Sequence, residues 1–348
     1  MTNIREQLTP ILDATTIMSP AAFVFCNEDY PVMPASPGDL PGFPNHPLPS
    51  NPLVRALQMV LYARCYSRRL KDDVASAPVA TLTAWDPSFV HQLSQANHTT
   101  SRWEGGWTIY ATMPTGQVSL IKGDRQRSAM PGEFIHAGPP GFAPQPGAIV
   151  SVQVLRESTV AQPGFYFVYS ETLSDMWDEH ALLRFYFNAP STAASTVLDN
   201  LTSQLNRYQV PFRMKALNSP AMYDRTDAIV LYVARRYYEI CVRVIRRLSS
   251  PVADELRRPV PLFTQQILPG VGLAEEPNTG ESFGMHRCRL TSEGVVDAWM
   301  VADQSSAGRV EAIAKRFQQG GFSLETPHLS PGSIDFPEVL EKVDLSYE

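Results

Sequence analysis

The sequence predicts an α+β protein in which helices flank a mixed, largely antiparallel sheet, with a division into two fused subdomains. Three observations support this class. The 348 residues are 44% hydrophobic and 18% charged, which is enough to bury a substantial core. Stretches with helical periodicity and stretches rich in β-branched and aromatic residues alternate without an internal repeat. The 30 prolines crowd residues 31–52 and 131–146, which predicts long ordered connections.

The first half combines helices with short strands. Apolar residues recur at helical spacing over 51–70, which predicts an amphipathic helix with Pro52 in its first turn, after a proline-rich connection over 30–52. The same test predicts a second helix over 86–97. Composition predicts strands that we expect to form one small antiparallel sheet: 107–110, 118–121 and 165–169.

The second half has longer and more regular elements. Periodicity predicts strands over 182–187, 211–217 and 229–233, and helices over 191–208, 237–248, 285–300 and 309–317. Residues 269–284 are expected to form a Gly-rich loop, and the chain is expected to end in an irregular acidic tail. A soft boundary near Asp175 would separate 1–175 from 176–348, and one sheet shared by the two parts is the alternative.

Charge and motifs exclude several classes of function. The net charge of −6 argues against nucleic acid held by the overall field, so any anion site must be local. The apolar runs are too short to cross a bilayer and the first residues lack a signal-peptide pattern, so we expect a cytoplasmic protein without a membrane partner. The chain has no P-loop, G-x-S-x-G or H-E-x-x-H motif, and its seven histidines lack ligand spacing. We therefore expect neither a metal nor a cofactor.

Cations on the strands of the second half are the most informative residues. Strand alternation places Arg184 and Tyr186 on one face, and Arg213 and Lys215 together on one face of the next strand. If these strands are neighbours, the four side chains form one basic patch. The alternative is that they form only the solvated face of a half-exposed sheet.

Three segments near the C-terminus resemble the signature of the HopA-type effector family: 261–264 (PLFT), 268–277 (LPGVGLAEEP) and 280–290 (GESFGMHRCRL). The likeness extends over most of the chain after the proline-rich connection. The family includes type III secreted effectors of bacteria and the stand-alone lyase components of class V lanthipeptide and thioamitide biosynthesis.

This resemblance implies a lyase that works with a separate Ser/Thr kinase. In the biosynthetic members, the kinase phosphorylates Ser or Thr in a precursor peptide that carries a leader. The HopA-like protein, here residues 176–348, then eliminates the phosphate and leaves dehydroalanine or dehydrobutyrine. Residues 1–175 would bind the peptide. The resemblance also admits a non-catalytic effector or a leader-peptide binding scaffold.

The effector members are distantly similar to phosphothreonine lyases. In those enzymes one strand carries a basic residue and, two positions on, a histidine acid, and a later strand carries the lysine base. Arg184-Phe185-Tyr186 and Arg213-Met214-Lys215 match these two elements, with Tyr186 in place of the histidine.

The chemistry of β-elimination fits the same residues. It requires a base for the Cα proton, a donor for the leaving oxygen and cations for the phosphate, but no metal. Lys215 suits the base because nearby guanidinium groups lower its pKa, and Tyr186 or His286 suits the donor. The candidate phosphate ligands are Arg184, Arg213, Arg287 and Lys122.

Each candidate has a structural alternative. Lys215 would be an exposed strand lysine, His286 a helix-start residue bonded to a loop carbonyl, and Lys122 a solvated turn residue. Glu275 and Glu281 would order the Gly-rich loop. We expect Asp227 to pair with an arginine.

Overall fold

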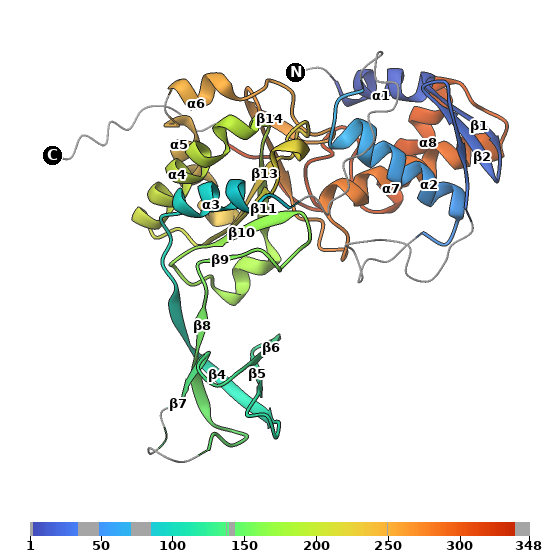
Figure 1. The fold of residues 1–348 in the computed structure, drawn as a ribbon. Coiled ribbons are helices and arrows are strands. Elements are labelled where there is room, and N and C mark those ends of the chain that lie inside the picture. Colours follow the sequence, from blue (N-terminus) through green and yellow to red (C-terminus); the bar gives the residue numbers. More distant parts are fainter. Residues whose placement is uncertain are drawn as a thin grey trace.

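The computed structural model describes residues 3–33, 49–70, 85–136, 138, 143–248 and 250–337. Within these residues the strands form antiparallel sheets of three, seven and five strands, so the α+β prediction is confirmed. The seven-stranded sheet lies at the centre with helices on both faces, and the five-stranded sheet projects from one end (Figure 1). Most of the proline-rich connection and the acidic tail, at 34–48 and 338–348, lie outside the described residues.

The central sheet has the strand order β14-β15-β11-β13-β12-β10-β9. Its strands are β9 (Glu157–Ser158), β10 (Phe165–Tyr169), β11 (Leu182–Phe187), β12 (Phe212–Leu217), β13 (Ile229–Ala234), β14 (Gln265–Leu268) and β15 (Val271–Glu275). The strands predicted at β11, β12 and β13 are confirmed. Because β9 and β10 precede Asp175, the sheet takes strands from both sides of the expected boundary, and the two parts share it.

Two sequence predictions about strands are wrong. Part of the expected Gly-rich loop is β15, which pairs with β11 along its whole length and is buried throughout. Gly270, with φ of +75°, makes the tight turn from β14, so glycine here marks a hairpin instead of a loop. Residues 165–169 form β10 of the central sheet and do not join a small sheet with 107–110, because β10 pairs with β12 over five consecutive residues.

One face of the central sheet is covered by α3 (Pro87–Gln95), α4 (Ser191–Arg207), α5 (Tyr238–Arg246) and α6 (Ser250–Glu255). The side chains of Phe185 and Phe187 on β11 join the core on this side. The apolar stripe predicted for α4 is fully buried against them, at Val197, Leu198, Leu201 and Leu205.

The opposite face is covered by α1 (Ile4–Asp13), α2 (Pro52–Leu61), the π-helical turn η1 (Tyr62–Tyr66), α7 (Phe283–Met300) and α8 (Ser306–Gln319). A three-stranded sheet lies beside them: β1 (Thr15–Ser19), β2 (Ala22–Phe25) and β3 (Glu28–Pro31). The helix predicted over 51–70 corresponds to α2 and η1, with Pro52 in the first turn. None of the helices in the described parts of the chain is both long and apolar enough to cross a membrane.

The projecting sheet has the order β6-β5-β4-β8-β7. Its strands are β4 (Arg102–Thr112), β5 (Val118–Lys122), β6 (Arg125–Ala129), β7 (Phe134–His136) and β8 (Ile149–Val154). Its small core includes Trp107, Ile109, Leu120 and Val152. It is joined to the central sheet through the segments that precede β4 and follow β8 (Figure 1).

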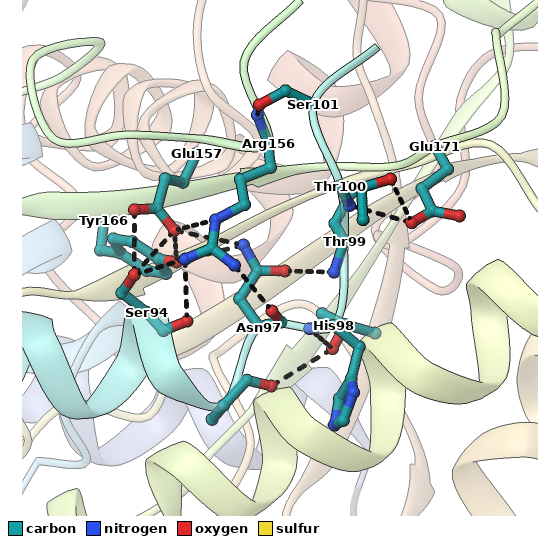
Figure 2. A network of polar contacts seen from close by, with 12 residues as sticks. Ser94, Asn97, His98, Thr99, Thr100, Ser101, Arg156, Glu157, Tyr166 and Glu171 are labelled. Carbon is teal, nitrogen blue, oxygen red and sulfur yellow. Dashed lines mark hydrogen bonds and ion pairs between the residues drawn. The ribbon is translucent and has the colours of Figure 1, made fainter.

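A polar network holds this junction (Figure 2). Arg156 forms an ion pair with Glu157 at 3.2 Å and donates to the Asn97 carbonyl at 3.3 Å. The Tyr166 hydroxyl donates to Glu157 at 2.7 Å. On the other side of the junction, the Thr100 amide donates to Glu171 at 2.9 Å. Both connections to the projecting sheet are therefore bonded to the body of the protein.

Helix α7 and helix α8 approach closely at Gly294. A Cβ atom there would lie 2.5 Å from Cα of Ile313, so the backbone of α8 would have to move. We expect Gly294→Ala to lower the free energy of unfolding by about 1–3 kcal/mol, measured by urea denaturation. Gly105→Ala is the control, because its Cβ would meet only Ser151 Oγ at 3.4 Å. Equal stability of the two variants would contradict this packing.

Candidate functional site

A cavity of about 160 Å³ lies between the central sheet and the helical layer formed by α2, η1 and α7. The sheet contributes Arg184, Tyr186, Lys215 and Tyr232, the layer contributes Tyr62, Tyr66, Ser282 and Gly284, and the loop before β13 contributes Arg225 and Asp227. The cavity thus contains two of the predicted cations and the predicted phenol.

Strand register explains why these side chains meet. Across β11, β13 and β12, Arg184 pairs with Tyr232 and Tyr232 with Arg213, so the three form one row. The next row on the same face contains Tyr186 and Lys215, on either side of Val230. The predicted gathering of the four side chains on one face is therefore present. Arg213 stands at the outer end of its row and is exposed.

Tyr232 lies between the two arginines. The Cζ atoms of Arg184 and Arg213 are 5.1 Å and 4.9 Å from the centre of its ring, within the range of a cation–π contact. Burial acts to raise the pKa of the Tyr232 phenol, but the cations of Lys215, Arg184 and Arg213 together lower the pKa below its ordinary value.

Lys215 is set into the wall of the cavity and is not an exposed strand lysine. Its ammonium lies 4.2 Å from the centre of the Phe165 ring and donates to Gln162 Oε1 at 3.2 Å. Burial lowers the pKa of Lys215, and Arg184 adds to the shift, while Tyr232 and Asp227 oppose it. A lysine in this environment gives up its proton more readily than one in water.

The arginines that line the cavity are paired with carboxylates, and Arg68 binds Asp224 at 2.7 Å. Arg184 forms an ion pair with Glu276 at the end of β15. Arg225 forms two hydrogen bonds with Asp227, each 2.8 Å long, which confirms the expected pairing of Asp227 with an arginine. Lys215 has no ion pair among the described residues.

Tyr186 presents a buried hydroxyl to the cavity. The side chain is 2% exposed, and its hydroxyl lies near the Tyr66 phenol. Burial raises the pKa of this phenol, against the effect of Arg184, so it keeps its proton near neutral pH and can donate.

The N-terminus of α7 also opens onto the cavity. Ser282, Gly284 and Met285 line it, and the Ser282 side chain makes no capping bond. Ser282 Oγ is buried without a partner among the described residues. The first N–H groups of a helix lack partners within the helix and favour anions. A Cβ atom on Gly284 would lie 2.3 Å from the Tyr66 ring, so glycine is required for η1 to pack against this helix end.

The other three predicted site residues lie elsewhere. Arg287 is fully buried in α7 and donates to the carbonyl oxygens of Pro327 at 2.7 Å and Leu329 at 2.9 Å. It therefore fixes the segment after α8. Lys122 lies on the projecting sheet, where it binds Glu104 at 2.9 Å and the Gly105 carbonyl at 2.8 Å. Neither residue lines the cavity.

His286 also does not line the cavity. Its ring lies 4.8 Å from that of Phe322, and its Nδ1 atom is 2.6 Å from Arg287. Burial lowers the pKa of His286 to about 3, with Arg287 and Arg289 contributing, so the imidazole is neutral and cannot serve as an acid near pH 7.

Glu281 and Glu275, the remaining acidic residues considered from the sequence, make structural contacts. Glu281 accepts a hydrogen bond from Arg289 at 2.8 Å, and Glu275 accepts one from the Ser330 amide at 2.7 Å. Among the described residues, no group of three or more His, Cys, Asp or Glu side chains is placed to hold a metal ion.

Sequence reasoning missed Tyr232, Tyr66 and Ser282. Tyr232 sits in a stretch correctly predicted as a strand, but its partners depend on the order and register of three strands. Ser282 could have been found from the helix predicted to begin at 285, since serine is a common residue just before a helix. No local pattern signals that Tyr66 packs against this helix end.

A known family and two solved structures are similar to this chain. The HopA1 effector protein family matches residues 156–329, and no curated protein matches the chain. An effector protein from Pseudomonas syringae pv. tomato strain DC3000 is similar in structure, at 14% identity and a TM-score of 0.43, over 79% of this chain and 90% of its own. An effector protein from P. syringae pv. syringae strain 61 is similar at 13% identity and a TM-score of 0.42, over 78% and 88%.

The environment of Lys215 predicts a pH-dependent effect on stability. Because its pKa is lower in the folded state than in the unfolded chain, the unfolded chain binds more protons between the two values, and stability rises with pH there. We expect Lys215→Met to be more stable than the wild type at neutral pH, with the gain shrinking as pH approaches 10.5, the ordinary lysine pKa. Urea denaturation at several pH values measures this.

Lys315→Met is the control, since Lys315 is exposed on α8. It should change stability little at any of these pH values. The contrary result is that Lys215→Met loses stability relative to the wild type, and loses equally at neutral and at high pH. It would show that burial of the Lys215 ammonium does not cost stability.

Proposed function

The chain belongs to the HopA1 effector protein family, and from that premise we propose that it is a lyase. It eliminates phosphate from phosphoserine or phosphothreonine in a peptide, leaving dehydroalanine or dehydrobutyrine. The observation that carries the proposal is the meeting in one cavity of a lysine with a lowered pKa, an arginine and an open helix N-terminus. A base and an anion site side by side are what this elimination needs.

Lys215 is the base in this proposal. Its neutral amine takes the Cα proton of the phosphorylated residue, the electron pair of the C–H bond forms the Cα–Cβ double bond, and the Cβ–O bond breaks. Inorganic phosphate leaves with the bonding electrons and takes a proton on the oxygen that was bound to Cβ. The lowered pKa of Lys215 brings its neutral form toward physiological pH.

The phosphate is held by Arg184 and the N-terminus of α7. Arg184 lines the cavity, and its guanidinium offers paired N–H donors that match phosphate oxygens. The first N–H groups of α7 and the unpartnered Ser282 hydroxyl add neutral donors. Arg213 lies two strands from Arg184 in the same row, and it adds positive charge at the exposed end of that row.

Tyr232 is the proton donor for the leaving oxygen. Of the four tyrosines that line the cavity, Tyr186 and Tyr232 stand on the sheet in the rows that contain Arg184 and Lys215. The cations around Tyr232 lower its pKa, whereas burial raises that of Tyr186. The phenol with the lower pKa releases its proton more easily to the departing phosphate. Tyr186 then serves as a neutral hydrogen-bond donor that orients the ester.

The substrate in this proposal is a precursor peptide phosphorylated by a separate Ser/Thr kinase. The elimination consumes a phosphate ester that this chain does not make. No metal or cofactor is assigned a role, because side chains supply the base, the donor and the anion site.

The direct test is the release of phosphate from a phosphothreonine peptide, with the alkene product identified by mass spectrometry. We expect Lys215→Ala to slow release by about a hundredfold to ten-thousandfold, because the base is lost. Lys315→Ala is the matched control and should retain the wild-type rate. Phosphopeptide binding without release in the wild type, with and without the kinase, would favour a non-catalytic binding protein and overturn the lyase.

The rate should depend on pH in a way that separates the two phenols. Wild-type activity should rise with pH as Lys215 loses its proton and fall again as Tyr232 loses its own, giving a bell-shaped profile. Tyr232→Phe should lower the rate and abolish the fall at high pH. Tyr186→Phe should keep that fall, and the reverse pattern would assign the donor to Tyr186.

A further inference from the structure

A second hollow lies next to the cavity, between the projecting sheet and one end of the strands of the central sheet. It has a volume of about 400 Å³ and is lined by parts of β4, β6 and β8 on one side and of β10, β12 and β13 on the other. We call it the inter-sheet groove. Of its lining residues, the proposed chemistry uses only Arg213 and Tyr232, which stand at the wall shared with the cavity.

Of the four arginines in the groove, Arg125 alone has an acidic partner among the described residues. Arg102, Arg127 and Arg213 line it, and none of the three has an ion pair among the described residues. Arg102 is half-buried, and its Nε atom is buried without a hydrogen-bond partner. Arg127 stacks over Trp107, with its Cζ atom 5.9 Å from the ring centre.

Most acids of the groove are already neutralised. Glu104 is 2.9 Å from both Lys122 and Arg125, Glu157 is 3.2 Å from Arg156, and Asp178 is 2.9 Å from Arg236. Of the lining acids, Glu179 alone lacks an ion pair among the described residues. The groove therefore offers three unpaired guanidinium groups against one unpaired carboxylate in a protein of net charge −6.

The groove and the cavity share a wall. Tyr232 lines both, and Arg213 and Arg184 contact its ring from neighbouring strands. The ion pair and hydrogen bonds around Arg156 and Glu157 join the base of the projecting sheet to the body of the protein (Figure 2). They therefore hold the two sides of the groove in position relative to each other. The two hollows are thus adjacent, with Tyr232 between them.

We propose that the inter-sheet groove binds an anionic stretch of the peptide substrate that flanks the phosphorylated residue. Its carboxylate or phosphate groups pair with Arg102, Arg127 and Arg213 while the reacting residue enters the cavity. This inference rests on the proposed function for the identity of the ligand as a phosphopeptide. It adds the substrate class: peptides with acidic or multiply phosphorylated flanks.

The test measures binding and turnover separately. Fluorescent peptides share a central threonine, either free or phosphorylated, with flanks of Glu, of phosphoserine or of Gln. Fluorescence anisotropy gives the affinity of the full chain for each peptide at low and high salt. We expect the Glu-flanked peptide with a free threonine to bind about tenfold more tightly than the Gln-flanked one at low salt, with the preference reduced by salt. A larger preference for phosphoserine flanks would identify phosphate as the better ligand.

Arg127→Gln and Arg102→Gln should each remove most of this preference and leave binding of the Gln-flanked peptide unchanged. Arg207→Gln is the matched control, since Arg207 is exposed on α4, the helix on the opposite face of the central sheet. Equal affinities for the Glu and Gln flanks, or the same result for Arg127→Gln and Arg207→Gln, would overturn the groove proposal. Phosphate release without a flank preference would overturn the groove alone, and a preference without release would overturn the lyase alone.

Discussion

The antiparallel register of β11, β13 and β12 is the constraint on which the candidate site depends. Residues on a strand alternate between faces, so a slip of one residue would send Arg184 and Lys215 into the core beneath α4 and bring Phe185 and Met214 to the cavity. The core prevents this slip, because Phe185, Phe187 and Met214 are fully buried on the α4 side. The apolar side chains on one face of each strand thereby fix which polar side chains face the cavity.

The cations of the cavity differ in whether a carboxylate is paired with them. Arg184 and Arg225 are each paired with a carboxylate, which offsets the cost of burying them. Lys215 has no ion pair among the described residues, and Tyr232 and Asp227 offset only part of the cost of its burial, so its pKa falls. A cation whose burial is only partly offset costs stability, a cost that active sites commonly carry. The same contrast separates Lys215 from Lys122, which two oxygen atoms hold on the projecting sheet.

Most helices and strands of the second half could be predicted from the sequence, and so could the site residues on β11 and β12. Alternation correctly placed Arg184 with Tyr186 and Arg213 with Lys215, because strand periodicity is local. It failed for Arg287 and His286, since the motif that contains them lies in a helix whose burial depends on α8 and on the segment at 327–329. It also failed at β15, where glycines that resemble a loop permit a hairpin, and at Tyr232, whose arginine neighbours belong to other strands.

The row of Arg184, Tyr232 and Arg213 also sets a length scale for the ligand. Neighbouring strands lie about 4.8 Å apart, so the first and last members of the row are separated by about 10 Å. An extended peptide advances about 3.4 Å per residue, and about three residues would cover that span. A phosphate held at Arg184 and a second anion at Arg213 therefore fit one extended chain crossing the strands over Tyr232. A folded or helical peptide, which rises about 1.5 Å per residue, would need about twice as many residues to reach from the cavity into the groove.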